Sequence, residues 1–296
     1  MSEYISYLRK EGKTVNEGTG SYYWINYEKG AVARGPAFIL DMPGKNEVAG
    51  ILKKMKPIVI TYNVDTETFA PNSFLYVTSD KSYSLEKLDK NGRRFTRIAL
   101  RNLDFRFVSW DDVLENGFNA YSDTRSRNGL SDGTFRNFTN VFGECKRNPA
   151  FKAIGAFLKE NNRMCAFLRI IEVDDWVEIT SSYSETEYLN TCPNNGLFNE
   201  ALNYYLTGNR ANVVSYGVSS IQSESKKEGL HGFKVRAGFE AKPIHRIFLL
   251  NPKYKLLVNK VSYKGVRLLL KLFPSDRRLK KIEGVMNMVL YGSNGK

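Results

Sequence analysis

Apolar residues in the C-terminal third of the chain recur first at the spacing of a helix and then at that of a strand. Leu230 and Phe233 lie three positions apart in the segment Glu228–Ala237, whose apolar face predicts a short helix. Gly238 follows at the position where a helix end favours a residue with positive φ. The apolar run Ile244–Leu250 comes next and predicts a strand.

A similar alternation of elements precedes this segment. The apolar, β-rich runs Arg163–Ile171 and Trp176–Tyr183 flank the polar turn Glu172–Asp175, a pattern that predicts a β-hairpin. Leu197–Leu206 then predicts a helix, and Val213–Gly217 predicts a short strand.

The other periodic segments predict an α/β lobe before residue 90 and a helix-rich stretch after it. In the lobe we expect a helix at Asn46–Met55 and strands at Tyr22–Tyr27, Ala37–Leu40, Ile58–Tyr62 and Ser73–Thr78. After it we expect a strand at Phe105–Ser109 and helices at Asn91–Asn102, Trp110–Ala120, Gly133–Arg147 and Pro149–Asn161. Near the C-terminus we expect a strand pair within Leu256–Leu272, and a helix over Arg277–Leu290 with its N-cap at Ser275-Asp276.

The order of these elements, with Phe233-Lys234 in a helix and Gly238-Phe239 after it, resembles the closing segment of the GCN5-related N-acetyltransferase (GNAT) fold. The likeness is to the variant found in FemAB-like aminoacyl and acyl transferases. The basic helix that begins with Asn91-Gly92-Arg93-Arg94 is similar to the Arg-rich helix that opens the second half of FemAB-like chains. The resemblance covers the chain from Leu85 to Asn251. It implies an α/β fold with a GNAT-like mixed sheet flanked by helices.

Three segments follow from the resemblance. Residues 1–90 would form an N-terminal α/β lobe, which the resemblance implies to be a degenerate second GNAT-like half. Residues 91–251 would form the GNAT-like acyltransferase domain, and residues 252–296 a basic C-terminal extension. The polar and charged stretch Ser79–Lys90 is the expected first boundary.

The resemblance implies an enzyme that transfers an acyl or aminoacyl group to an amine of a sugar, peptide or envelope-precursor acceptor. Acetyl-CoA users of this superfamily carry a Gln/Arg-x-x-Gly-x-Gly/Ala loop whose N–H groups hold the pyrophosphate. The corresponding place, Thr191–Gly196, has one glycine and a proline. No bound cofactor is expected, and acyl-CoA and aminoacyl-tRNA both stay open as the donor co-substrate. The alternative function is a non-catalytic binding module with a degenerate GNAT core and a basic tail for nucleic acid or membrane.

Two residues are expected to take part in catalysis. In related aminoacyl transferases a lysine at the place of Lys234 lies near the reactive end of the donor, where its charge favours a developing oxyanion. A surface lysine on an amphipathic helix is the alternative interpretation. Tyr216 is expected at a strand end beside the split in the central sheet, where it would protonate a leaving group or orient the nucleophile. The alternative is a core tyrosine with a satisfied hydroxyl group.

Further residues are expected to bind the donor or the acceptor. Asn194 and Asn195 begin the helix that faces the donor in the family, and their amides with the N–H of Gly196 would hold a phosphate. Helix N-capping is the alternative explanation of the asparagines. Ser219 and Ser220 are expected to hydrogen-bond the acceptor. The other residues expected at the site are Tyr183, Gly217 and Phe233.

The formal net charge of +13 is unevenly distributed. Lys253–Lys281 holds ten lysines and arginines and one acidic residue, Asp276. Two interpretations stay open. The segment is either a solvated basic tail or a surface for an anionic partner, which would be tRNA, a nucleotide-linked sugar or an anionic bilayer.

Cysteine and histidine content bears on the compartment and on metal binding. The three cysteines show no metal-ligand spacing and only two histidines are present, so we expect no metal site. Free cysteines favour a reducing, cytoplasmic compartment. The first residues show no signal-peptide pattern, and no apolar stretch is long enough to span a bilayer. We therefore expect a cytoplasmic protein, with peripheral contact at the inner face of the membrane left open.

Overall fold

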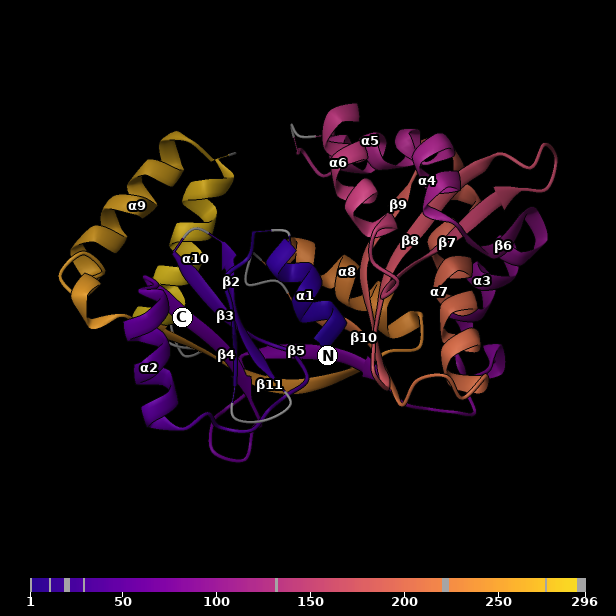
Figure 1. The fold of residues 1–296 in the computed structure, drawn as a ribbon. Coiled ribbons are helices and arrows are strands. Elements are labelled where there is room, and N and C mark those ends of the chain that lie inside the picture. Colours follow the sequence, from indigo (N-terminus) through magenta and orange to yellow (C-terminus); the bar gives the residue numbers. More distant parts are fainter. Residues whose placement is uncertain are drawn as a thin grey trace. The chain divides into compact units, whose positions relative to one another are not determined.

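A computed structural model of the chain (Figure 1) describes residues 2–10, 12–18, 22–28, 30–130, 133–219, 224–274 and 276–291. The chain divides into two units that interleave in sequence. Unit 1 comprises Met1–Tyr7, Tyr76–Gly217 and Gly232–Glu240. Unit 2 comprises Leu8–Leu75, Val218–His231 and Ala241–Lys296. The boundaries expected at residues 90 and 251 therefore do not coincide with the units, because the C-terminal residues group with the N-terminal ones.

Unit 1 is built on an antiparallel meander with one parallel strand added. The strands are β6 (Leu103–Val108), β7 (Phe151–Leu158), β8 (Met164–Val173), β9 (Trp176–Ser184) and β10 (Val213–Val218). β6 to β9 pair antiparallel in sequence order, which confirms the predicted β8–β9 hairpin. β10 pairs with β9 in parallel. A parallel neighbour requires a crossover connection, and α7 (Pro193–Leu202) is the helix in it.

Helices cover both faces of this sheet (Figure 1). One face carries α4 (Trp110–Asn116), α5 (Phe118–Arg127) and α6 (Phe135–Lys146). There Phe142 of α6 lies 5.3 Å from Phe167 of β8, between ring centroids. α7 lies on the opposite face, where Ser182 hydrogen-bonds Asn194, and α3 (Lys90–Asn102) packs beside α7. Short helical turns complete the connections at Leu85–Lys87 (η1), Thr186–Thr191 (η2) and Asn203–Thr207 (η3).

The expected helix at Pro149–Asn161 is wrong, because this segment forms β7. Every residue of β7 except Lys152 is buried, since the strand lies between β6 and β8 with both faces covered. A strand buried on both faces loses its alternation of apolar and polar residues, and the resulting apolar run resembles a helix.

The main strands of unit 2 neighbour one another in the order β1-β2-β3-β4-β11. Its strands are β1 (Val15–Glu17), β2 (Tyr23–Glu28), β3 (Ala31–Gly35), β4 (Val59–Val64) and β11 (Glu240–Leu250). β3 and β4 are parallel and the other neighbours antiparallel. α2 (Lys45–Met55) connects β3 to β4 and buries Val48 and Ile51 in a core around Trp24. The suggestion that this lobe is a degenerate second half stays a prediction.

Two expectations for unit 2 are wrong. The strand expected at Ala37–Leu40 lies earlier, at β3, because Pro36 has no N–H to continue a strand ladder. The strand pair expected within Leu256–Leu272 is instead a helix, α9 (Lys260–Leu272), which Asn259 caps by accepting from the N–H groups of Val261 and Ser262. The remaining elements are α1 (Ser2–Lys10), β5 (Ser73–Thr78), the turn η4 (Pro252–Tyr254) and α10 (Arg277–Tyr291).

Asp276 accepts hydrogen bonds from the backbone of Arg278 and Leu279, which confirms it as a cap of α10. Ser275, expected beside it, lies outside the described residues. Among the described residues, no helix combines the length and the apolar character needed to cross a membrane.

The helix and the strand predicted around Gly238 are confirmed as α8 (Glu224–Arg236) and β11. Gly238 lies between them and has the expected positive φ, +104°.

A Cβ atom at Gly238 would lie 2.7 Å from Cε2 of Tyr83. We therefore expect Gly238→Ala to lower the free energy of unfolding by about 2–3 kcal/mol, measured by urea denaturation. Gly229→Ala is the matched control, because its Cβ meets nothing within 4 Å and alanine favours a helix by about 1 kcal/mol. Equal stabilities of the two variants would contradict the expectation.

Candidate functional site

Lys234, on α8, is a buried lysine with only 5% of its surface exposed. Its Nζ donates to the backbone oxygen of Tyr216 at 2.9 Å. The ammonium group lies 4.1 Å from the ring centroid of Tyr76 and 4.4 Å from that of Tyr216. The interpretation of Lys234 as a surface lysine is therefore wrong. A carbonyl and two aromatic rings hold its charge inside unit 1.

Burial brings the pKa values of Lys234 and of a nearby carboxyl group close to neutrality. Desolvation lowers the pKa of Lys234 to about 8, and the charge of Glu178 opposes this shift. Desolvation raises the pKa of Glu178 to about 7, opposed by the charges of Arg169 and Lys234. Near pH 7.5 both groups are therefore mostly charged but close to giving up that charge.

Glu178 was not among the residues expected from the sequence. It lies on β9 and is the pairing partner of Ser215 on β10, one residue before Tyr216. The available signal was a carboxylate between two apolar residues of the strand, Val177 and Ile179. Glu178 also lies in the parallel pairing of β9 with β10, and that pairing could not be read from the sequence.

Tyr216 and Gly217 lie near the end of β10, where the backbone is irregular at Gly217. Gly217 has a φ of +66°, a value that residues other than glycine rarely adopt. Its N–H donates to the Oγ of Ser215 at 3.1 Å. Burial raises the pKa of Tyr216 to about 12, so its phenol keeps its proton at neutral pH. The structure thus brings Tyr216, its neighbour Gly217 and Lys234 together, and their role in binding or catalysis stays a prediction.

An aromatic cluster fixes the position of these groups. The ring of Phe198 on α7 lies 4.7 Å from that of Tyr216 and 5.3 Å from that of Phe233, between centroids. Phe239, at the end of the Gly238 turn, lies 5.8 Å from Tyr216. Phe233 therefore helps to hold Tyr216 through Phe198, while its neighbour Lys234 contacts Tyr216 directly.

The start of α7 uses its polar residues for internal contacts. The N-cap is Cys192, which makes no side-chain cap, so the explanation of Asn194 and Asn195 as N-caps is wrong. Asn194 instead bonds Ser182, with 2.5 Å between the two side-chain oxygens. The N–H of Asn195 donates to the oxygen of Cys192. A Cβ atom at Gly196 would overlap the ring of Phe105, so this glycine allows close approach of helix and sheet.

Tyr183 lies apart from this cluster. It is buried among aromatic residues on the face covered by α5 and α6. Its ring is stacked on that of Phe167 at 4.9 Å and tilted against that of Tyr121 at 5.3 Å, between centroids. Strand neighbours point to opposite faces, and Ser182 points to α7. A role of Tyr183 in donor binding stays a prediction.

Of the two serines expected at the site, the structure describes Ser219. Ser219 belongs to unit 2, where its hydroxyl lies 2.8 Å from that of Ser73 and its N–H donates to the oxygen of Phe74. Ser220 lies outside the described residues.

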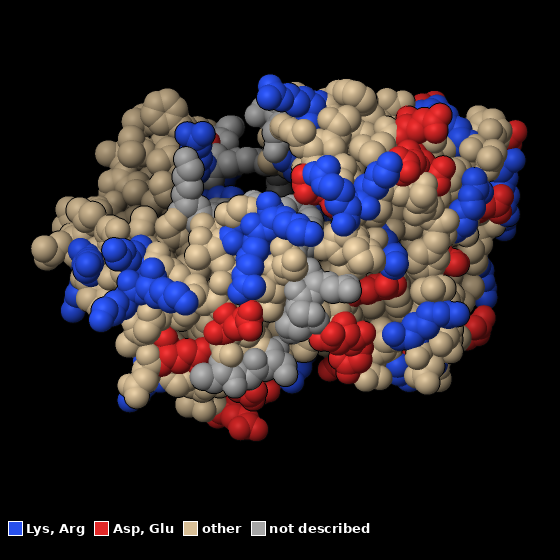
Figure 2. Space-filling model, in the orientation of Figure 1, with Lys and Arg blue, Asp and Glu red and all other residues tan. Residues whose placement is uncertain are grey.

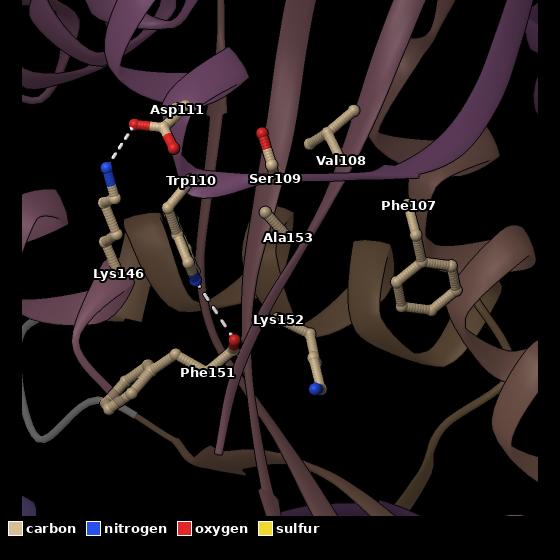
Figure 3. A pocket seen from close by; sticks show the side chains of 9 residues that line it. All are labelled: Phe107, Val108, Ser109, Trp110, Asp111, Lys146, Phe151, Lys152 and Ala153. Carbon is tan, nitrogen blue, oxygen red and sulfur yellow. Dashed lines mark hydrogen bonds and ion pairs between the residues drawn. The ribbon is translucent and has the colours of Figure 1, made fainter. Parts of the chain in front are cut away.

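A pocket of about 430 Å³ opens elsewhere in unit 1 (Figure 3). Its lining residues are Phe107, Val108, Ser109, Trp110, Asp111, Lys146, Phe151, Lys152 and Ala153. Most of its polar side chains are engaged with protein partners. Asp111 pairs with Lys146 at 2.7 Å, and Trp110 donates to the oxygen of Phe151 at 3.0 Å. None of the expected site residues lines this pocket, and we place no chemistry there. In the described part of the chain, no group of three or more His, Cys, Asp or Glu side chains is placed to hold a metal ion.

Comparison with known proteins gives the fold. No protein-family model and no curated protein sequence matches this chain. Among solved structures, FemX is similar with a TM-score of 0.61 and 13% identity, over 87% of this chain and 93% of that one. L-PGS from Bacillus licheniformis is similar with a TM-score of 0.54 and 9% identity, over 86% and 93%.

A third similar structure is the C-terminal domain of a protein named as a lysylphosphatidylglycerol synthetase, from Agrobacterium fabrum. Its TM-score is 0.56 and its identity 10%, over 82% of this chain and 86% of that one. At these identities the similarity establishes the fold. It confirms the predicted α/β fold of a mixed sheet flanked by helices, similar to that of FemX.

Proposed function

We propose that the protein transfers an acyl or aminoacyl group from a thioester or aminoacyl-tRNA donor to an amine of a sugar, peptide or envelope-precursor acceptor. The observation that carries this proposal is the buried Lys234 ammonium, held against Tyr216 and within electrostatic reach of Glu178. Burial of a charged lysine opposes folding, so a lysine on α8 that is buried against Tyr216 points to a use in chemistry.

Acyl transfer to an amine needs an oxyanion stabilised and a proton removed. As the amine attacks the donor carbonyl, negative charge develops on the carbonyl oxygen. An ammonium group has three donors and Tyr216 occupies one, so Lys234 keeps donors for this oxygen. Glu178, ionised above its raised pKa, is the group we assign to accept the proton of the amine. The neutral phenol of Tyr216 would supply a proton to the leaving group.

The start of α7 bears on the choice of donor. The ring of Phe105 occupies the space beside Gly196, and the N–H of Asn195 already donates to the oxygen of Cys192. These contacts support an aminoacyl-tRNA donor over acyl-CoA, because a pyrophosphate needs free N–H groups at a helix start. An amine acceptor is common to both donors.

An intact-mass and radiolabel assay separates the donors. The protein is incubated with acetyl-CoA, a long-chain acyl-CoA or a mixture of charged tRNAs, together with amine acceptors. We expect label to pass from charged tRNA to an acceptor with the native chain and not with Lys234→Met. Binding of none of the three donors would reject the transferase and favour the binding-module alternative.

A further inference from the structure

Helix α9 of unit 2 exposes an apolar stripe. Val261, Leu268 and Leu272 are 80%, 61% and 66% exposed. Their spacings of seven and four residues place them within about 40° of one another around a helix of 3.6 residues per turn. The preceding Leu256 is 89% exposed, and the following Phe273 also faces solvent. Exposed apolar side chains therefore also precede and follow α9.

The opposite face of α9 is the one that packs inside the protein. Tyr263 is buried there, and its hydroxyl donates to Glu283 of α10 at 2.6 Å. Its ring lies 5.5 Å from that of Tyr291, at the end of α10. The exposed leucines are therefore not the face that holds α9 to α10. They lie on the side of α9 away from this contact.

Basic residues flank the stripe along one side. Lys260, Lys264 and Lys271 lie about 60–100° from the line of Val261 and Leu272, by the same helical geometry. All three are exposed, and α9 contains no acidic residue. On the face drawn in Figure 2 the surface over α9 is mostly uncharged. The helix thus has a packed face, an apolar face and a basic flank.

We propose that α9 lies flat on an anionic lipid bilayer, with its apolar stripe among the acyl chains and its lysines at the phosphates. A nucleic acid would use the lysines alone and leave the leucines in water, whereas a bilayer uses both. The helix is too short to span a membrane, in keeping with an interfacial position. This proposal does not depend on the proposed transferase activity.

Vesicle cosedimentation of the full chain tests the proposal. The probes are vesicles of 30% phosphatidylglycerol in phosphatidylcholine and vesicles of phosphatidylcholine alone, at low and high salt. We expect binding to the anionic vesicles to weaken about thirtyfold in Lys264→Gln/Lys271→Gln, since each lysine near the surface contributes a factor of about five. Leu268→Ser/Leu272→Ser should weaken it about tenfold, because the leucines no longer enter the acyl region.

Matched controls use exposed residues of elements other than α9. Lys53→Gln/Lys54→Gln on α2 and Leu100→Ser/Leu189→Ser in unit 1 should bind the vesicles as the native chain does. All four variants change exposed side chains, and circular dichroism verifies that each is folded. Native protein that ignores anionic vesicles at low salt would overturn the proposal. The proposal would also be overturned if the leucine double variant bound vesicles as the native chain does while the lysine double variant lost binding to tRNA. That combination would assign the surface to nucleic acid.

Insertion of the stripe has its own readout. Leu272→Cys in a Cys192→Ser background carries an environment-sensitive fluorophore, and Lys53→Cys in the same background is the control. We expect a blue shift on anionic vesicles for the label at position 272 and none at position 53. Equal spectra at the two positions with bound vesicles would overturn the insertion of α9.

Discussion

Replacing Lys234 with methionine is expected to lower kcat/KM about 10²–10³-fold, while raising the free energy of unfolding at pH 7. The activity falls because the variant loses the charge that we assign to the oxyanion, and loss of one such donor typically has an effect of this size. Methionine fills nearly the same volume between the rings of Tyr76 and Tyr216, so packing is kept.

The gain in stability follows from the lowered pKa of Lys234. An unfolded lysine keeps its proton up to about pH 10.5, whereas the buried one releases it near pH 8. The native state therefore binds this proton more weakly, a deficit of about 3 kcal/mol that is fully present below pH 8 and vanishes as the pH rises to that of the unfolded group. Lys234→Met removes the deficit, so its advantage in urea denaturation should be larger at pH 7 than at pH 9.5.

A matched variant separates a catalytic role from a general effect on α8. Arg236→Met changes a basic residue on the same helix that is only partly buried, and we expect kcat/KM within about twofold of the native value and stability within about 0.5 kcal/mol. Unchanged turnover in Lys234→Met would remove the lysine from the chemistry. A fall in both turnover and stability would show instead that the lysine supports the fold.

The elements that sequence predicted well are those whose signals are local. Trp176–Ser184 and its hairpin partner are bounded by a polar turn, and Gly238 marks a helix end by its own backbone requirement. β7 was misread because its apolar run comes from burial between β6 and β8, which is a property of the sheet and not of the segment. α9 was misread because its leucines face solvent, so that the apolar pattern did not report a packed face.

The residues of the candidate site likewise include some that the sequence predicted and one that it did not. Lys234 and Tyr216 were expected because the resemblance to FemAB-like chains places them, but the burial of the lysine was not, since both its neighbours on α8 are at least partly exposed. Glu178 is distant from Lys234 in the sequence and approaches it only through the pairing of β9 with β10. Contacts of this kind follow from strand order, which residue patterns did not specify.

The second large effect is expected from Glu178→Gln, in the dependence of kcat/KM on pH. With the native chain we expect a bell-shaped profile whose acid limb reflects ionisation of Glu178 near pH 7 and whose alkaline limb reflects loss of the Lys234 proton near pH 8. Because the two groups interact, the limbs report pKa values of the pair. Activity should be greatest between them, where the carboxylate and the ammonium are both charged.

Glutamine cannot accept the proton of the amine, so kcat/KM at the optimum should fall about 10²-fold and the acid limb should disappear. The alkaline limb should move to lower pH, because the charge of Glu178 raises the pKa of Lys234 and the variant lacks it. The free energy of unfolding, measured against pH, gives a second test of the raised pKa of Glu178. The native carboxyl group ionises less readily than in the unfolded chain, so Glu178→Gln should gain stability over the native chain as the pH rises from 4.5 to about 7. Glu115→Gln, an exposed carboxylate on α4, should leave both profiles unchanged. An acid limb that persists in Glu178→Gln would assign proton acceptance to another group.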